Sequence, residues 1–118
     1  MTRFALLAGT ALAALAFAAQ SVAMTPPKLQ GDVGPGFTIH LKKAAKAVKT
    51  LTAGKYTITV ADKSSIHNFH LTGPGVNKEI TGVGFVGTKT VTLTFKKGTY
   101  KYVCDPHAGA MKGSFKVT

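Results

Sequence analysis

An alternating segment in the C-terminal third of the chain reads Thr90-Val91-Thr92-Leu93-Thr94-Phe95-Lys96-Lys97-Gly98-Thr99-Tyr100-Lys101-Tyr102-Val103. Apolar side chains take every second position on each side of the turn signal Lys97-Gly98. A period of two puts successive side chains on opposite faces of a strand. The segment therefore predicts two β-strands joined by a tight turn, each with one face against a hydrophobic core.

The same alternation recurs elsewhere in the chain, with threonine frequent between the apolar positions. The further runs lie at 37–41, 56–60 and 115–117. Glycine-containing turn signals separate the runs, at 53–54, 73–75, 82–87 and 97–98. Several short strands with such turns predict an all-β fold, either an antiparallel β-sandwich or a barrel.

Two segments depart from this pattern. Residues 24–36 contain three prolines and three glycines, so we expect an irregular leader and a well-ordered core from about residue 36. Residues 42–49 are helix-like but brief, and they are equally compatible with a basic connection between strands. Residues 24–118 are enough for one domain and too few for multi-domain oxidases, Rossmann enzymes or TIM-type barrels.

The first 23 residues have the organisation of a secretory signal peptide. Arg3 precedes an Ala- and Leu-rich segment at 4–19, and residues 21–23 (Ser-Val-Ala) form a small-x-small cleavage site. The apolar segment is short for a membrane span, so an uncleaved anchor is the weaker alternative. We expect cleavage near Ala23, export to the periplasm or to the outside of the cell, and no stable membrane anchor.

The 118-residue chain is strongly basic, with 15 Lys and Arg against 4 Asp and Glu and a formal net charge of +11. So few carboxylates leave little material for paired-carboxylate catalysis. The positive charge favours partner proteins with acidic docking surfaces, or anionic membrane surfaces, with encounter rates that depend on salt. Nucleic-acid binding is not expected, because Arg3 is the only arginine and no aromatic recognition motif accompanies the lysines.

Cys104 is the only cysteine, which excludes an intramolecular disulfide and a zinc site built from paired cysteines. In an exported protein, an unpaired thiol is expected to be buried, crosslinked or bound to a metal. His107 and Met111 follow on the same short loop, so thiolate, imidazole and thioether lie close together in sequence. This soft ligand set suits copper better than magnesium or calcium. A buried structural cysteine is the alternative.

A blue-copper site needs a second imidazole. His67 and His70 are the candidates, and His40 lies on the outward side of an earlier predicted strand. If Phe69 and Leu71 point into the core, His67 shares their side of the strand and His70 faces outward. This phase favours His67 as the ligand and predicts that His40 is a surface histidine.

The segment from Gly98 to His107 resembles the ligand loop of plastocyanin-like cupredoxins, including its Gly-x-Tyr beginning, and His67-Asn68 resembles their upstream His-Asn pair. The resemblance extends from about Gly36 to Thr118. It implies a cupredoxin-like Greek-key antiparallel β-sandwich that holds one copper ion, alternating between Cu(I) and Cu(II).

The resemblance implies that His67, Cys104 and His107 are the strong ligands and that Met111 is the weak axial ligand. The loop between His107 and Met111 is one residue shorter than is usual in plastocyanins and one longer than in amicyanins, which leaves the length of the axial bond open. An alternative places Met111 simply in the core, with the axial position empty or filled by a carbonyl oxygen.

The resemblance also implies roles beyond the ligands. Asn68 would join the two ligand loops by hydrogen bonds, and Tyr100 would form a tyrosine corner. His107 would be the partly exposed port for electrons, with an apolar rim at 108–110. Asp105 places a negative charge beside the metal, which lowers the reduction potential unless another group screens it.

The predicted function is an exported type 1 copper protein, a monomer, that transfers single electrons between redox partner proteins and is not an enzyme. The alternative is a copper carrier or storage protein that uses the same ligands without redox turnover. Such proteins are often rich in methionine, whereas only Met24 and Met111 follow the predicted cleavage site. A structural sandwich with a vestigial site is a third hypothesis.

Overall fold

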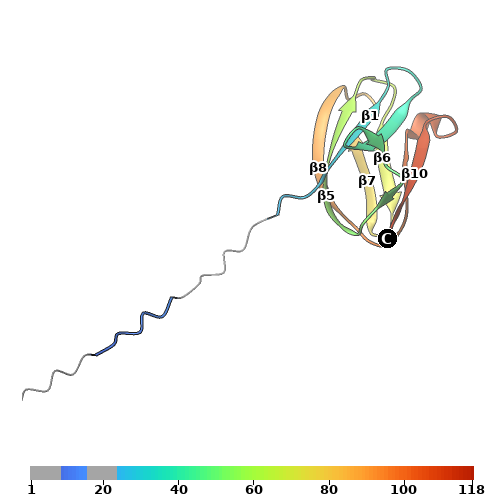
Figure 1. Ribbon diagram of the computed structural model, residues 1–118. Helices are drawn as coiled ribbons and strands as arrows, with labels where there is room; N and C mark the ends of the chain where they lie inside the picture. The colour runs from blue at the N-terminus through green and yellow to red at the C-terminus, as the bar shows by residue number, and fades with distance from the viewer. Residues whose placement is uncertain (1–8, 16–23) are drawn as a thin grey trace, which may run out of the picture.

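The computed structural model describes residues 9–15 and 24–118 of the chain (Figure 1). Residues 9–15 have no regular secondary structure. Most of the predicted signal peptide at 1–23, including its cleavage site, lies outside the described residues. None of the helices in the described part has the length and apolar character that a bilayer crossing requires.

The protein is a sandwich of two five-stranded sheets, which confirms the predicted all-β fold (Figure 1). Sheet A contains, in spatial order, β3 (Lys46–Ala47), β2 (Ile39–Lys43), β1 (Lys28–Val33), β5 (Gly54–Asp62) and β8 (Gly87–Phe95). Sheet B contains, in spatial order, β4 (Thr50–Leu51), β10 (Lys112–Val117), β9 (Gly98–Val103), β6 (Phe69–Gly73) and β7 (Val76–Thr81). A short 3-10 helix, η1 (Asp105–His107), follows β9.

Two strand pairs in the sandwich are parallel, and the remaining pairs are antiparallel. β1 runs parallel to β5, and β10 runs parallel to β4. Parallel neighbours need a crossover of a dozen or more residues, and the chain between β1 and β5 supplies one through β2, β3 and β4. The expectation of an antiparallel sandwich therefore holds for most of the ladder but not for these two pairs.

The prediction of an irregular leader up to residue 36 is wrong for residues 28–33, which form β1. β1 is a central strand of sheet A, and its Leu29 and Val33 are fully buried in the core. The prolines of this segment bracket the strand at 26–27 and 35 rather than interrupt it. Within the strand, Gly31 lies so close to the ring of Phe69 that an added Cβ would approach it to 3.0 Å. A glycine that looks like a turn signal thus serves close packing between the sheets.

The helix-like interpretation of residues 42–49 is also wrong. The segment forms a hairpin in which β2 and β3 pair around Ala44 and Ala45, whose φ angles are 49° and 66°. Positive φ at both central residues is typical of a two-residue type I′ turn. Alanine and lysine favour helices, but so short a segment cannot offset the unfavourable nucleation of a helix, so strand pairing prevails.

Apolar side chains from both sheets meet in one core between them. The aromatic rings of Phe95, Tyr100 and Phe115 pack against one another at centroid distances of 4.8 to 5.4 Å. The hydroxyl of Tyr100 donates to the carbonyl oxygen of Pro74 at 2.7 Å and accepts from the backbone N–H of Lys96 at 2.9 Å. These contacts are those expected of a tyrosine corner, and they tie β9 to the turn between β6 and β7.

Candidate metal centre

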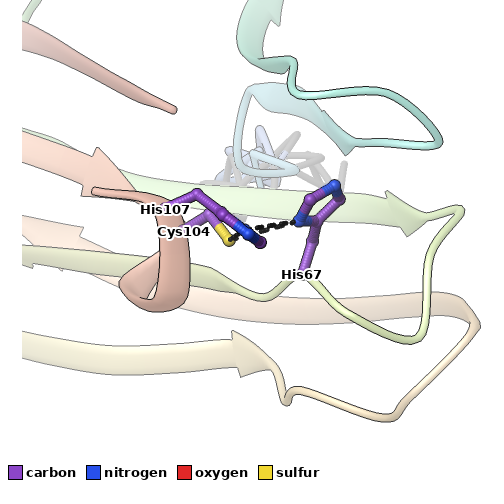
Figure 2. A group of neighbouring side chains, drawn as sticks. All are labelled: His67, Cys104 and His107. Atoms are coloured by element: carbon purple, nitrogen blue, oxygen red, sulfur yellow. Dashed lines mark hydrogen bonds between the residues drawn. The ribbon is translucent and has the colours of Figure 1, made fainter. Parts of the chain in front are cut away.

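The predicted ligands come from separate segments that meet at one end of the sandwich. His67 lies on the connection between β5 and β6, and Cys104 directly follows β9. His107 ends the short helix η1, and Met111 directly precedes β10. Figure 2 shows the side chains of His67, Cys104 and His107 pointing toward one another. The C-terminus lies at the opposite end of the sandwich (Figure 1).

Three donor atoms form a small triangle. The Nδ1 atoms of His67 and His107 are 3.1 Å apart, and Cys104 Sγ lies 3.6 Å from the first and 3.7 Å from the second. The point equidistant from the three atoms is about 2.0 Å from each, close to the roughly 2.0–2.3 Å bonds that a first-row ion such as zinc makes to His and Cys. The triangle therefore fits a metal ion with two nitrogen ligands and one sulfur ligand.

Burial differs among the three residues in a way that gives the site an inner and an outer side. Cys104 and His67 are 0% exposed, whereas His107 is partly exposed. The Nε2 atom of His67 is buried without a protein hydrogen-bond partner, so the polar contacts of this ring are all directed into the triangle. His107 is consequently the ligand candidate nearest to solvent.

Phe37 covers the two histidines from outside. Its ring meets His67 and His107 edge to face, at centroid distances of 5.4 Å and 4.9 Å. The sequence pattern placed Phe37 inside the core, but the residue precedes β2 and is 60% exposed. That prediction is wrong because the alternation 37–41 begins two residues before the strand does, and nothing in a period of two marks where a strand starts.

Met111 is held beside Cys104 by the backbone of the loop. Its N–H donates to the carbonyl oxygen of His107 at 2.8 Å, and its own carbonyl accepts from the N–H of Cys104 at 3.0 Å. The side chain of Met111 is fully buried. The loop is thus closed by its own backbone, which keeps the buried Met111 next to Cys104 in space.

Asn68 joins the two ligand loops, as the sequence analysis expected. Its side-chain oxygen accepts from the N–H of Asp105 at 2.7 Å, and its amide nitrogen donates to the Asp105 carboxylate at 2.7 Å and to Glu79 at 3.3 Å. Asn68 is itself buried. Since Asn68 follows His67 and Asp105 follows Cys104, these bonds hold the two ligand residues in place without any contribution from the metal.

The partner of Asp105 is His70, a contact that the sequence pattern did not predict. The Nδ1 atom of His70 lies 2.9 Å from the Asp105 carboxylate, and its Nε2 lies 2.6 Å from the side-chain oxygen of Asn77. Both ring nitrogens face oxygen acceptors, so the doubly protonated imidazolium is favoured. The sequence did indicate that His70 faces outward on the strand that follows His67. It did not indicate which residue His70 contacts there.

The pKa values of this pair move in opposite directions. The hydrogen bond to Asn77 raises the pKa of His70 above 6.5, partial burial opposes the rise, and Asp105 and Glu79 reinforce it. For Asp105, partial burial acts to raise the pKa, but the hydrogen bonds from Asn68 and His70 and the charge of His70 together bring it below 3.8. The negative charge expected next to Cys104 is therefore screened by His70.

His40 lies apart from this site. It contacts Asp32 at 2.8 Å on sheet A and is exposed, in agreement with its predicted position on the surface.

The residues of the metal centre and the fold agree with the comparisons to known proteins. A family model described as copper binding proteins, plastocyanin/azurin family, matches residues 13–118. The chain belongs to the plastocyanin/azurin family of copper-binding proteins. Copper is accordingly its cofactor, and the soft donor atoms of the triangle suit that metal.

Individual members of the plastocyanin/azurin family and their structural neighbours resemble the chain to different extents. It is 70% identical to a plastocyanin of Daucus carota over 30 residues, which span 25% of this chain and only 30% of that protein. Reduced rusticyanin aligns with a TM-score of 0.59 and 25% identity, over 82% of each chain. Auracyanin A, a blue copper protein of Chloroflexus aurantiacus, aligns with a TM-score of 0.56 and 22% identity, over 80% of this chain and 100% of that one.

Proposed function

We propose that this protein is an exported type 1 copper protein that passes single electrons between redox partner proteins. The observation that carries the proposal is the convergence of Cys104 Sγ with the Nδ1 atoms of His67 and His107 within 3.7 Å of one another. Two imidazoles and one thiolate in a plane are the equatorial set of a blue-copper centre. The signal-like segment at 1–23 supports export.

In this proposal His67, Cys104 and His107 hold the metal, and Met111 is the axial ligand from the buried side. Bound copper supplies a one-electron couple between Cu(I) and Cu(II). The hydrogen bonds of Asn68 keep the two ligand loops at one separation in both oxidation states, which limits the rearrangement that accompanies each transfer. His107 forms the exposed side, where a partner approaches over the small residues 108–110 and Phe37.

The other histidines support a carrier rather than an oxidase. His40 is engaged by Asp32, and His70 is engaged by Asp105 and Asn77. His40 lies on β2 of sheet A and His70 lies on β6 of sheet B, and the described residues form no second histidine cluster of the kind that multicopper enzymes need for further copper centres.

The test is the visible and electron-paramagnetic-resonance spectrum of the purified protein loaded with Cu(II). We expect an intense thiolate-to-copper charge-transfer band and narrow copper hyperfine splitting, both lost in Cys104→Ala. His40→Ala is the matched control, because it removes a histidine remote from the triangle and is expected to leave both signals intact. A pale spectrum that Cys104→Ala does not change contradicts the proposal and favours the copper carrier or storage protein.

Reversible redox turnover separates the two functions even when the ligands are the same. In cyclic voltammetry we expect one reversible one-electron wave from the copper-loaded protein. A centre that binds copper but gives no reversible wave supports storage instead.

A further inference from the structure

The outer face of sheet B along β9 and β10 carries a concentration of lysines. On β10, Lys112, Ser114 and Lys116 are exposed while Phe115 and Val117 are buried. On β9, Thr99 and Lys101 are exposed and alternate with the buried Tyr100 and Tyr102. The register places neighbouring outward side chains in three cross-strand pairs: Lys112 with Val103, Ser114 with Lys101, and Lys116 with Thr99. We call these six residues the β9–β10 face.

A hollow lies at the end of this face where Val103 and Lys112 pair, next to the metal centre. Its volume is about 420 Å³, and Lys101, Val103, Lys112, Gly113 and Ser114 line it. Gly113 packs directly on the ring of Tyr102, which leaves no room for a side chain there. The side chains of Lys101 and Lys112 thus line, together with Ser114 and Val103, a hollow whose surface is mostly apolar. Two lysines beside apolar surface suit a side chain that ends in a carboxylate.

The lysines of this face form no ion pair with any described residue, although sheet B also carries Glu79 on β7 and the adjoining loop carries Asp105, whose carboxylate is engaged by His70 and Asn68. Strands β4, β9 and β10 contain no acidic residue. Within residues 24–118, the two ion pairs both join a histidine to an aspartate, and no lysine of that range forms one. Unpaired positive charges this close together attract an acidic surface at long range.

The hollow adjoins the metal centre through the chain itself. Val103 is bonded to Cys104, and Lys112 is bonded to Met111. A partner seated in the hollow therefore lies one residue from two of the four ligand candidates. It also lies on the sheet side of the site, away from the exposed edge of His107 and the loop 108–110.

We propose that the β9–β10 face docks an acidic segment of one redox partner, distinct from the partner that approaches over His107, with a carboxylate of that segment held between Lys101 and Lys112. This inference rests on the proposed electron-transfer function and adds to it a docking surface and the chemistry of the partner. The position of the hollow beside the metal centre favours an acidic protein segment over a lipid surface or a free inorganic anion as its occupant.

The experiment titrates the ¹⁵N-labelled, Cu(I)-loaded protein with a glutamate-rich peptide and follows the backbone amide signals. We expect the largest shifts at 99–103 and 112–116. Lys101→Glu/Lys112→Glu is expected to weaken peptide binding by at least about fivefold. The control Lys28→Glu/Lys55→Glu changes the net charge by the same amount, at exposed positions of sheet A. We expect this control to change the affinity for the peptide by less than about twofold.

Several outcomes overturn the docking surface. If the two double variants weaken peptide binding equally, binding depends on net charge alone. Inorganic phosphate that binds the face as tightly as the peptide indicates a small-anion site, and anionic lipid vesicles that bind while the peptide does not indicate a membrane surface. Retention of shifts and affinity in Lys101→Glu/Lys112→Glu places the partner elsewhere.

The copper spectrum separates failure of this inference from failure of the function. The four lysines are exposed, so we expect both double variants to keep the charge-transfer band and the dispersed amide spectrum of the folded protein. If the band is present and peptide binding does not depend on Lys101 and Lys112, the docking surface is wrong and the electron-transfer function stands. If the unsubstituted protein has no such band, the function itself fails.

Discussion

At the scale of single residues, the most connected side chain near the metal centre is that of Asn68. It bonds to both the backbone and the carboxylate of Asp105 and also reaches Glu79. A neutral side chain thus supplies the acceptor for the backbone N–H of Asp105 and joins two segments that are far apart in sequence. The positions of the ligand candidates His67 and Cys104 depend on these bonds, although Asn68 is not itself a ligand candidate.

We expect Asn68→Ala to lower the free energy of unfolding by about 2–3 kcal/mol, because it removes these bonds and leaves the Asp105 N–H without its acceptor. Urea unfolding of the copper-free protein measures this loss. Asn77→Ala is the control, since Asn77 is exposed and bonds only to His70, and it is expected to lose less than about 1 kcal/mol. Equal losses in the two variants contradict a special role for Asn68.

The pair of His70 and Asp105 predicts how stability depends on pH. The pKa of His70 is raised above 6.5 in the folded state, so its contribution is full below 6.5 and is lost as the pH rises through the raised pKa. The pKa of Asp105 is lowered below 3.8, so its contribution is present above 3.8 and is lost as the pH falls through the lowered pKa. Stability from this pair is therefore greatest between the two folded-state values.

Unfolding midpoints in urea, recorded across this range, check the prediction. We expect His70→Gln to be less stable than the unsubstituted protein at mildly acidic pH and to approach it at alkaline pH, where the unsubstituted His70 is neutral. His40→Gln serves as the comparison on sheet A. A gap between His70→Gln and the unsubstituted protein that does not narrow as the pH rises is the contrary result.

At the scale of secondary-structure elements, β9 is the central strand of sheet B. Its tyrosines pack in the core, and Cys104 directly follows its last residue. The hydroxyl of Tyr100 anchors the strand through Pro74 and Lys96. Gly73 packs directly on the same ring, so the turn between β6 and β7 closes over it. The position of the thiol at the end of β9 is thereby tied to a contact near the other end of the strand.

We expect Tyr100→Phe to lower the free energy of unfolding by about 1–3 kcal/mol, since two backbone groups lose their buried partner while the ring remains. Thermal unfolding monitored by circular dichroism measures the change. Tyr56→Phe is the matched control, because its hydroxyl makes a single bond, to the carbonyl oxygen of Thr52 at 2.7 Å, and the expected loss is about 0.5–1.5 kcal/mol. A loss in Tyr100→Phe no larger than that in Tyr56→Phe argues against the tyrosine corner as an anchor.

Elements were predicted unevenly from the sequence, for identifiable reasons. The long runs of β8 and β9 have a clear period of two, so their type followed from pattern alone. β1 was missed because its flanking prolines and internal glycine resemble a loop, whereas the parallel pairing that makes it a strand is with β5, far along the chain. The β2–β3 hairpin was missed because its turn consists of alanines, which carry no turn signal.

At the scale of the whole molecule, the packing of the core and the geometry of the metal centre are both made by the chain itself. The buried apolar side chains of both sheets form one cluster, and the ligand triangle occupies one end of it. The hydrogen bonds of Asn68 and the closed loop from Cys104 to Met111 are made by the chain alone. We therefore expect the sandwich to fold without copper.

We expect the copper-free protein to keep its β-sheet circular dichroism spectrum, and copper to raise its stability by mass action, by about 4 kcal/mol when free metal is a thousandfold above its dissociation constant. Calorimetry with and without copper measures the gain. Cys104→Ala removes one of the three strong ligand candidates and is expected to lose most of it. A copper-free protein that is unfolded contradicts the expectation that the sandwich folds without copper.

The sequence by itself determined what is local: the strand alternation, the basic composition, the donor types and their order, and the phase that separates His67 from His70. Tertiary structure alone decided which side chains meet across strands, including the pairing of His70 with Asp105, the cover of Phe37 over the histidines and the gathering of lysines on the β9–β10 face. The physical reason is that side-chain direction follows from the backbone period, which neighbouring residues set. Cross-strand neighbours depend on which distant strands pair and in what register, and that is set by packing of the whole core.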